Sequence, residues 1–81
     1  MRFEEYFIIF PEGDVQEISG PLRIGELVDL NGRSLPLPLA DTRIIAFKVA
    51  AIRIREERNA TEHYHRLELV SASELKAHVR R

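Results

Sequence analysis

The alternation of hydrophobic and polar residues at the start of the chain predicts two short strands. Residues 3–10, FEEYFIIF, are rich in aromatic and β-branched side chains, which fit a pleated sheet better than a helix. Residues 11–14, PEGD, have the residue types of a turn, because proline presets φ and Gly13 can take a positive φ. The VQEI segment then returns as a second strand, and residues 19–21, SGP, interrupt the chain again.

The next unit is a hairpin that contains two prolines. Asn31-Gly32 is the strongest two-residue hairpin signal, because a type I′ turn needs a positive φ at both positions. With that loop, Pro36 and Pro38 fall at non-hydrogen-bonded positions, so the N–H groups that they lack would have faced outward. We therefore predict an edge strand that the prolines protect from further pairing. The same register places six apolar side chains on the core face: Ile24, Val28, Leu30, Leu35, Leu37 and Leu39.

Residues 43–55, RIIAFKVAAIRIR, form the longest apolar stretch and predict a further strand. The inward side chains change phase along it, from Ile45, Phe47 and Val49 to Ile52 and Ile54. A phase change at Ala50-Ala51 is typical of a β-bulge where a sheet curls. The alternative is a helix that begins at Asp41, since part of the stretch also has helical spacing. We favour a strand and leave open a partly helical segment.

The end of the chain predicts one more strand and a helix. Residues 56–62 are a polar loop, and residues 63–70, HYHRLELV, alternate as a strand. Ser71 and Glu74 have the spacing of a capping box, so a helix over about residues 72–80 should follow. Its apolar stripe is Ala72, Leu75 and Val79, and its last turn is basic, with Lys76, His78, Arg80 and Arg81.

These elements predict one mainly β domain over residues 1–81, strand-rich from 3 to 70. Five to six short strands in 81 residues indicate a small, antiparallel, partly open barrel of the SH3 or OB kind. The C-terminal helix would close one mouth of the barrel or cover an open seam. A fold of this kind hosts many functions, so it does not by itself indicate one.

Composition excludes several classes of protein. Without cysteine there is no disulfide framework, thiol chemistry or thiolate zinc site. No segment approaches the roughly 18 apolar residues of a membrane span, so we expect a soluble, cytoplasmic protein that does not bind membranes. The net charge is −1, with −5 on residues 1–41 and +4 on residues 42–81. Such asymmetry can mark a basic binding face, although strands of opposite charge can also neutralise each other in one sheet.

Three histidines are the candidates for a metal site. His63 and His65 share one strand face, and His78 on the helix could approach them, which would give zinc three imidazole ligands. The competing interpretation is two polar residues at the loop end of a hairpin. We favour this second interpretation and therefore predict no metal and no cofactor.

A second candidate is an arginine face. If the isoleucines of residues 52–55 face the core, Arg53 and Arg55 point outward, as do Tyr64 and Arg66 on the facing strand. Three guanidinium groups around one aromatic ring could bind phosphates and stack on a base. Against this, the same hairpin has four acidic residues: Glu56, Glu57, Glu62 and Glu68.

The sequence therefore favours a non-enzymatic interaction module. We expect it to bind a protein partner through an unprotected sheet edge, or to associate with its own copy as a homodimer. The alternative is a single-stranded nucleic-acid-binding domain that uses Arg53, Arg55, Tyr64 and Arg66. No nucleophile and base have a spacing that indicates catalysis, so we do not expect an enzyme.

Overall fold

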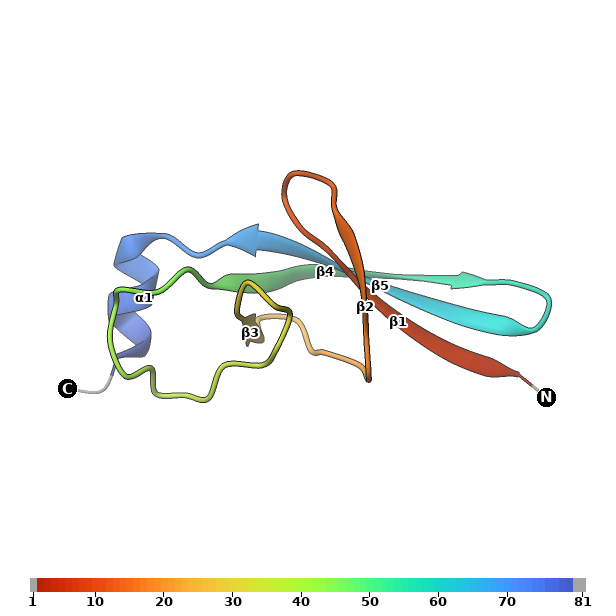
Figure 1. Ribbon diagram of the computed structural model, residues 1–81, viewed down its shortest axis with the longest axis horizontal. Helices are drawn as coiled ribbons and strands as arrows, with labels where there is room; N and C mark the ends of the chain where they lie inside the picture. The colour runs from red at the N-terminus through yellow and green to blue at the C-terminus, as the bar shows by residue number, and fades with distance from the viewer. Residues whose placement is uncertain (1, 80–81) are drawn as a thin grey trace.

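A computed structural model describes residues 2–79, and in this range it has five strands and one helix (Figure 1). The elements are β1 (Phe3–Ile9), β2 (Val15–Ile18), β3 (Leu27–Val28), β4 (Phe47–Glu56), β5 (Ala60–Leu69) and α1 (Ala72–His78). The strands form one curled, half-barrel sheet in the order β2-β1-β5-β4-β3. The molecule measures 48 × 23 × 17 Å, with α1 at one end and the turn between β4 and β5 at the other.

The predicted hairpin at the start of the chain is confirmed. β1 and β2 pair antiparallel, with Ile9 opposite Val15. In the turn, the Phe10 N–H donates to the Asp14 carbonyl at 2.9 Å, and Gly13 has a φ of +102°. The turn therefore uses the conformational freedom that only glycine offers there.

The bulge that the sequence predicts in β4 is also confirmed. The register against β5 shifts between Val49 and Ala51, so residues 47–56 form a strand and the helical alternative is wrong. The following loop is shorter than predicted. Glu57 N–H already donates to the Ala60 carbonyl at 2.8 Å, so β5 begins three residues earlier than the predicted strand.

The sheet is mixed, which corrects the prediction of a purely antiparallel one. β1 runs parallel to β5, from Phe3 opposite Ala60 to Ile9 opposite Arg66. Short turns force neighbouring strands to be antiparallel, but β1 and β5 are separated by β2, β3 and β4, and this long connection permits a parallel pair. The likeness to an SH3 or OB barrel stays a prediction.

The Asn31-Gly32 turn forms, but its register differs from the predicted one. One carboxylate oxygen of Asp29 accepts hydrogen bonds from Asn31 N–H at 2.8 Å and from Arg33 N–H at 3.0 Å. Asp29 N–H donates to the Arg33 carbonyl at 2.9 Å, and this closes a three-residue loop in which Gly32 has a φ of +79°. Val28 therefore pairs with Ser34, whereas the predicted two-residue loop would pair it with Leu35.

This shift removes the predicted edge strand after the turn. Pro36 and Pro38 are exposed and lie outside the strands, so they protect no ladder. Leu35 N–H still donates to the Leu27 carbonyl at 2.9 Å, and Leu39 forms a bridge to Val79 after the helix. Of the six predicted core residues, Val28 and Leu39 are buried and Leu35 is partly buried, whereas the others are exposed: Ile24, Leu30 and Leu37. A slip of one residue is enough to send side chains to the other face.

The core consists of two clusters on opposite sides of β3. The consecutive residues Leu27 and Val28 are both buried, and each belongs to a different cluster. The first cluster, under the middle of the sheet, contains Ile8, Phe10, Val28, Phe47, Val49 and Leu67. The second, between α1 and the chain that precedes β4, contains Leu27, Leu39, Ala46, Val70 and Leu75.

The helix begins where the sequence predicts. The Ser71 hydroxyl accepts a hydrogen bond from Glu74 N–H at 3.2 Å, and α1 buries Leu75. Ala72, expected on the apolar stripe, is exposed. Arg80 and Arg81 lie outside the described residues. α1 has seven residues and is the only helix between residues 2 and 79, and none in this range is long and apolar enough to cross a membrane.

Candidate functional site

The structure brings the four residues of the predicted arginine face together. Arg53 and Arg55 on β4, and Tyr64 and Arg66 on β5, line one hollow of about 700 Å³. In the register of the two strands, Arg53 lies opposite Tyr64. These side chains share one face of the sheet because side chains alternate between the two faces along β4 and β5.

Carboxylates neutralise most of this face. Arg55 pairs with Glu57 and lies 3.9 Å from Glu62. Arg66 pairs with Glu68, with 3.5 Å between the charged atoms. Among residues 2–79, Arg53 has no carboxylate within the 4.0 Å of an ion pair. Arg53 thus has the least neutralised charge of this face.

Tyr64 already uses both its ring and its hydroxyl within the protein. The ring stacks on Phe7 of β1 with 5.0 Å between the ring centres and 17° between the planes. The hydroxyl donates to Glu62 at 3.2 Å. Removal of the phenol from water and the nearby Glu62 carboxylate raise the pKa of Tyr64. One face of the ring is therefore covered by Phe7.

The histidines occupy different environments. His65 is buried, with Nδ1 2.8 Å from the Phe7 carbonyl and Nε2 accepting from Leu22 N–H at 3.1 Å. His63 stacks on Tyr6, and its Nε2 lies 3.1 Å from a Glu4 carboxylate oxygen. Both nitrogens of His65 therefore have protein partners.

His78 lies on α1, at the opposite end of the molecule from the turn that precedes His63 (Figure 1). Between residues 2 and 79, no group of three or more His, Cys, Asp or Glu side chains is arranged to hold a metal ion. The structure therefore does not bring the three histidines into one site.

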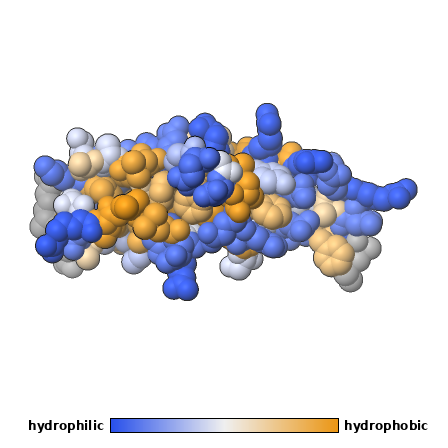
Figure 2. Space-filling model, turned by 45° about the horizontal axis from the view of Figure 1, so that its top comes forward, coloured by the Kyte–Doolittle hydropathy of each residue, from blue (hydrophilic) through white to orange (hydrophobic). Residues whose placement is uncertain are grey.

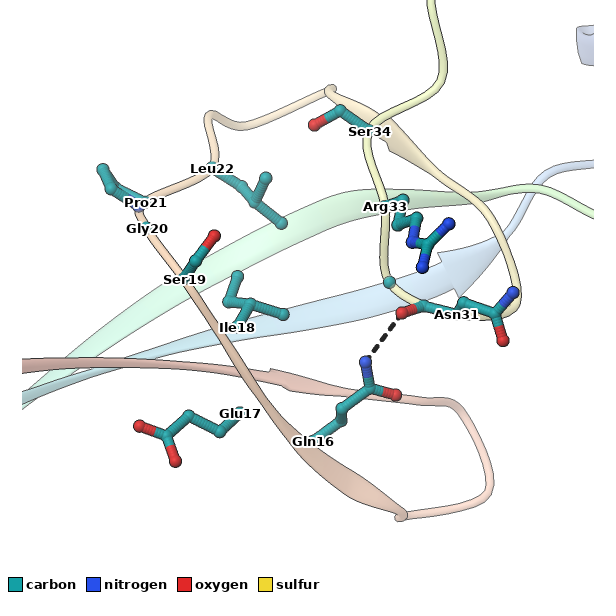
Figure 3. Close-up of a pocket in the computed structure, with 11 residues that line it drawn as sticks. Gln16, Glu17, Ile18, Ser19, Gly20, Pro21, Leu22, Asn31, Arg33 and Ser34 are labelled. Carbon is teal, nitrogen blue, oxygen red and sulfur yellow. Dashed lines mark hydrogen bonds between the residues drawn. The ribbon is translucent and has the colours of Figure 1, made fainter.

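A second hollow, of about 430 Å³, lies between β2 and the hairpin loop (Figure 3). The Gln16 amide crosses it and donates to the Asn31 carbonyl at 2.7 Å. Arg33 also lines it from the loop, whereas the Glu17 side chain extends from β2 away from the loop. This hydrogen bond joins β2 to the loop, so the Gln16 side chain spans part of the hollow.

A third feature, the open edge of β4, was not predicted from the sequence. β3 covers only Phe47 and Lys48 of this edge, and Gly25 and Glu26 bond to Val49. From Ala51 to Glu56 the outer side of β4 has no neighbouring strand among residues 2–79. Figure 1 shows this part of β4 in the arm that extends away from α1. The arm contains only β1, β5 and β4.

The backbone groups that face this edge follow from the hydrogen-bond pattern. Glu57 N–H points inward, because it donates to Ala60 across the hairpin. Inward and outward residues alternate along an antiparallel strand, so Ile52, Ile54 and Glu56 direct their N–H and C=O groups outward. Within residues 2–79, these three residues make no backbone hydrogen bond outside the strand ladders. The edge thus presents a short row of unpaired donors and acceptors.

The isoleucines on this edge are exposed, which corrects the prediction that they face the core. Ile52 is 38% exposed and Ile54 is 58% exposed. They lie on the same sheet face as His65, but the arm extends beyond the loop that covers that residue. The sequence signal for this edge was the alternation of isoleucine and arginine, which shows that residues share a face but not that the face is covered.

A broad apolar area also lies on one face toward the α1 end (Figure 2). Ile45, before β4, and Leu69, opposite Phe47, are exposed at 52% and 61%. Ile45 was predicted to be inward and is not. At this end β3 pairs with β4 at Phe47 and Lys48.

The comparisons with known proteins identify a family without indicating an activity. No curated protein and no solved structure matches the chain. One family model matches residues 2–78 and is described as an uncharacterised Treponema protein. The match includes every strand and the helix. The chain therefore belongs to this family of uncharacterised Treponema proteins.

Proposed function

We propose that this protein is a non-enzymatic interaction module, which binds a protein partner by adding a strand of that partner to the open edge of β4. The observation that carries the proposal is the row of outward backbone groups at Ile52, Ile54 and Glu56. An extended segment can satisfy these groups by main-chain hydrogen bonds, which is a common mode of peptide recognition.

The side chains at the edge support the same mode of binding. An exposed apolar edge strand pairs readily with other chains, and proteins usually protect such an edge with charges, prolines or a covering loop. Here Ile52 and Ile54 are exposed beside it, and the arginines that alternate with them lie on the opposite face of the sheet. A second strand would bury these isoleucines, so pairing gains both hydrogen bonds and apolar burial.

Selection from a random peptide library tests the proposal. Peptides are selected on the wild-type protein and counter-selected on Ile54→Pro, which removes one outward N–H without removing a bond to β5. A second blocked variant, Ile54→Lys, places a charge at the edge and keeps the backbone N–H. Circular dichroism establishes that both variants are folded. We expect enriched peptides that bind the wild type and lose binding to both variants.

Amide hydrogen exchange then locates the bound peptide. Strand addition should slow exchange at Ile52, Ile54 and Glu56, and change Arg53 and Arg55 little, because their amides already bond to β5. Enriched peptides that bind Ile54→Pro and Ile54→Lys as well as the wild type would contradict the proposal. An empty selection would contradict it as well.

Single-stranded nucleic-acid binding is the second candidate function. It is favoured by Arg53, which lacks a carboxylate neighbour among residues 2–79 and lies opposite Tyr64. Neutralising about three phosphates would give a slope near −2 in log K against log salt on single strands. Anisotropy titrations with oligo-dT and oligo-rU measure this slope, whereas the module proposal expects no binding even at low salt.

A further inference from the structure

From the side chains on the open edge, we infer that the partner segment alternates apolar and acidic residues. The inference rests on the proposed strand addition and adds the chemistry of the partner. The segment is extended, with apolar side chains beside Ile52 and Ile54 and carboxylates beside Arg53 and Arg55. It contains at least four residues in this alternation.

The geometry of an added antiparallel strand determines these positions. Directly opposite residues lie on the same face of a sheet, so the neighbours of Ile52 and Ile54 share their face, and the neighbours of the arginines share the other. Ile54 points its backbone groups outward and forms a hydrogen-bonded pair with the partner. Arg53 and Arg55 therefore fall in non-hydrogen-bonded pairs, in which the Cα atoms are about 4.5 Å apart and the side chains are closer.

The local charges indicate which residues fit beside the arginines. Arg53 has no ion pair within residues 2–79, and a carboxylate on the next strand would supply one. Arg55 already pairs with Glu57 and is 3.9 Å from Glu62, so it contributes less to the preference. A lysine or arginine in the partner would face these guanidinium groups and repel them. Arg53 is thus the main determinant of the acidic preference.

The same charges disfavour a second copy of this chain at the edge. Two β4 edges related by a two-fold axis must place outward residues opposite each other. With Ile52 opposite Ile54 of the other copy, Arg53 meets its own equivalent. With Ile54 opposite Ile54, each Arg53 meets an Arg55. Both of these registers therefore place like charges side by side, which destabilises the pair. In the third register, with Ile52 opposite Ile52, Arg53 meets Ala51, but Glu56 of the other copy would have to pair with Lys48, whose outer side β3 already occupies.

Defined peptides test the inference. The probes are fluorescein-labelled Ser-Val-Glu-Val-Glu-Val-Ser and its counterpart with lysine in place of glutamate, and anisotropy measures the two dissociation constants. We expect the wild-type protein to bind the glutamate peptide at least tenfold more tightly than the lysine peptide. Arg53→Glu should reverse this preference. Arg33→Glu, which makes the same charge change at an exposed residue of the hairpin loop, should preserve it.

Backbone methylation of the glutamate peptide shows whether it binds as a strand. N-methylation of the valines removes the N–H groups that face Ile52 and Ile54, and should weaken binding at least tenfold. N-methylation of the glutamates, whose N–H groups point away, should change binding less than threefold. Variants that fail to fold do not affect this comparison, because it uses only the wild-type protein.

Three results would overturn the inference. If the two peptides bind equally and N-methylation of the valines still weakens binding, the acidic preference is wrong but strand addition is supported. No binding by either peptide, together with a dimer that Ile54→Lys converts to a monomer, would assign the edge to a second copy. No binding by a monomeric protein would also reject the alternating acidic partner, and the library selection would then decide whether the edge binds other strands.

Discussion

The buried imidazole of His65 accepts a hydrogen bond from the backbone N–H of Leu22, 43 residues earlier in the chain, at 3.1 Å. Because Leu22 N–H can only donate, Nε2 of His65 must be unprotonated. Nδ1 then carries the proton and donates to the Phe7 carbonyl at 2.8 Å. One neutral side chain thus joins β1, β5 and the loop after β2.

His65→Leu should therefore destabilise the protein more than its change in volume suggests. The variant keeps an apolar side chain but leaves Leu22 N–H without its acceptor and removes one bond to the Phe7 carbonyl, which costs about 1–3 kcal/mol of unfolding free energy. Urea unfolding measures this loss. The control is His63→Leu, which removes a partly exposed pair with Glu4 and the stacking on Tyr6 and should cost less, about 1 kcal/mol. Equal losses in the two variants would show that the bonds of His65 do not stabilise the fold.

Glu26 should make stability depend on pH in the acidic range. Its carboxylate accepts from the Ser34 hydroxyl at 2.6 Å and from Arg23 N–H at 3.0 Å, and these bonds lower its pKa below the usual 4.5. A lowered pKa in the folded state stabilises the protein above the unfolded pKa, and this contribution is lost as pH falls through the folded value. Ser34→Ala should therefore destabilise the protein at pH 7 and have less effect near pH 3.

Urea unfolding of Ser34→Ala at both pH values measures this difference. Ser19→Ala, at another exposed serine, is the matched control and should show no such pH dependence. A Ser34→Ala effect of the same size at pH 7 and pH 3 would mean that the hydroxyl does not act through the charge of Glu26.

Local elements of this fold were predictable because their signals are local. Gly13 marks the first turn, the phase change at Ala50-Ala51 marks the bulge, and Ser71 marks the start of the helix. Each depends on residues within a few positions of each other. The common face of Arg53 and Tyr64 was predictable for the same reason, because they lie in consecutive strands.

Features that depend on competition or on distant contacts were not predictable. The Asp29 carboxylate bonds to two backbone N–H groups and favours a three-residue loop over the two-residue turn that Asn31-Gly32 favours alone. The parallel pairing of β1 with β5 has no turn to signal it. Alternation shows that Ile52 and Ile54 share a face, but only the tertiary structure shows that both side chains are exposed. The open edge of β4 was missed for this last reason.

Gly32→Ala should destabilise the protein, because this glycine combines a positive φ with close neighbours. A Cβ atom there would lie 2.7 Å from Cδ1 of Ile8 and 2.9 Å from Nε2 of Gln16. The backbone strain alone is worth about 1–3 kcal/mol. Gly20→Ala is the matched control, since a Cβ at Gly20 has no atom within 4 Å and its φ is not positive. Thermal unfolding should show a clear loss for Gly32→Ala only, and equal midpoints would contradict this reading of the loop.

The ion pair between Lys48 and Glu74 should hold α1 against β4. The ammonium lies 3.0 and 3.2 Å from the two carboxylate oxygens, and each side chain is 32% exposed. The sequence places Glu74 in a capping box, but in the structure its carboxylate reaches β4. A double-mutant cycle with Lys48→Met and Glu74→Gln should give a coupling energy of about 0.5–1 kcal/mol, which added salt reduces.

Glu74→Gln keeps the backbone N–H that Ser71 caps, so the helix start is unchanged. The pair Arg66 and Glu68, within one strand and more exposed, is the matched control and should show weaker coupling. Additive effects of the two substitutions would show that α1 is held by Leu75 and its apolar neighbours alone.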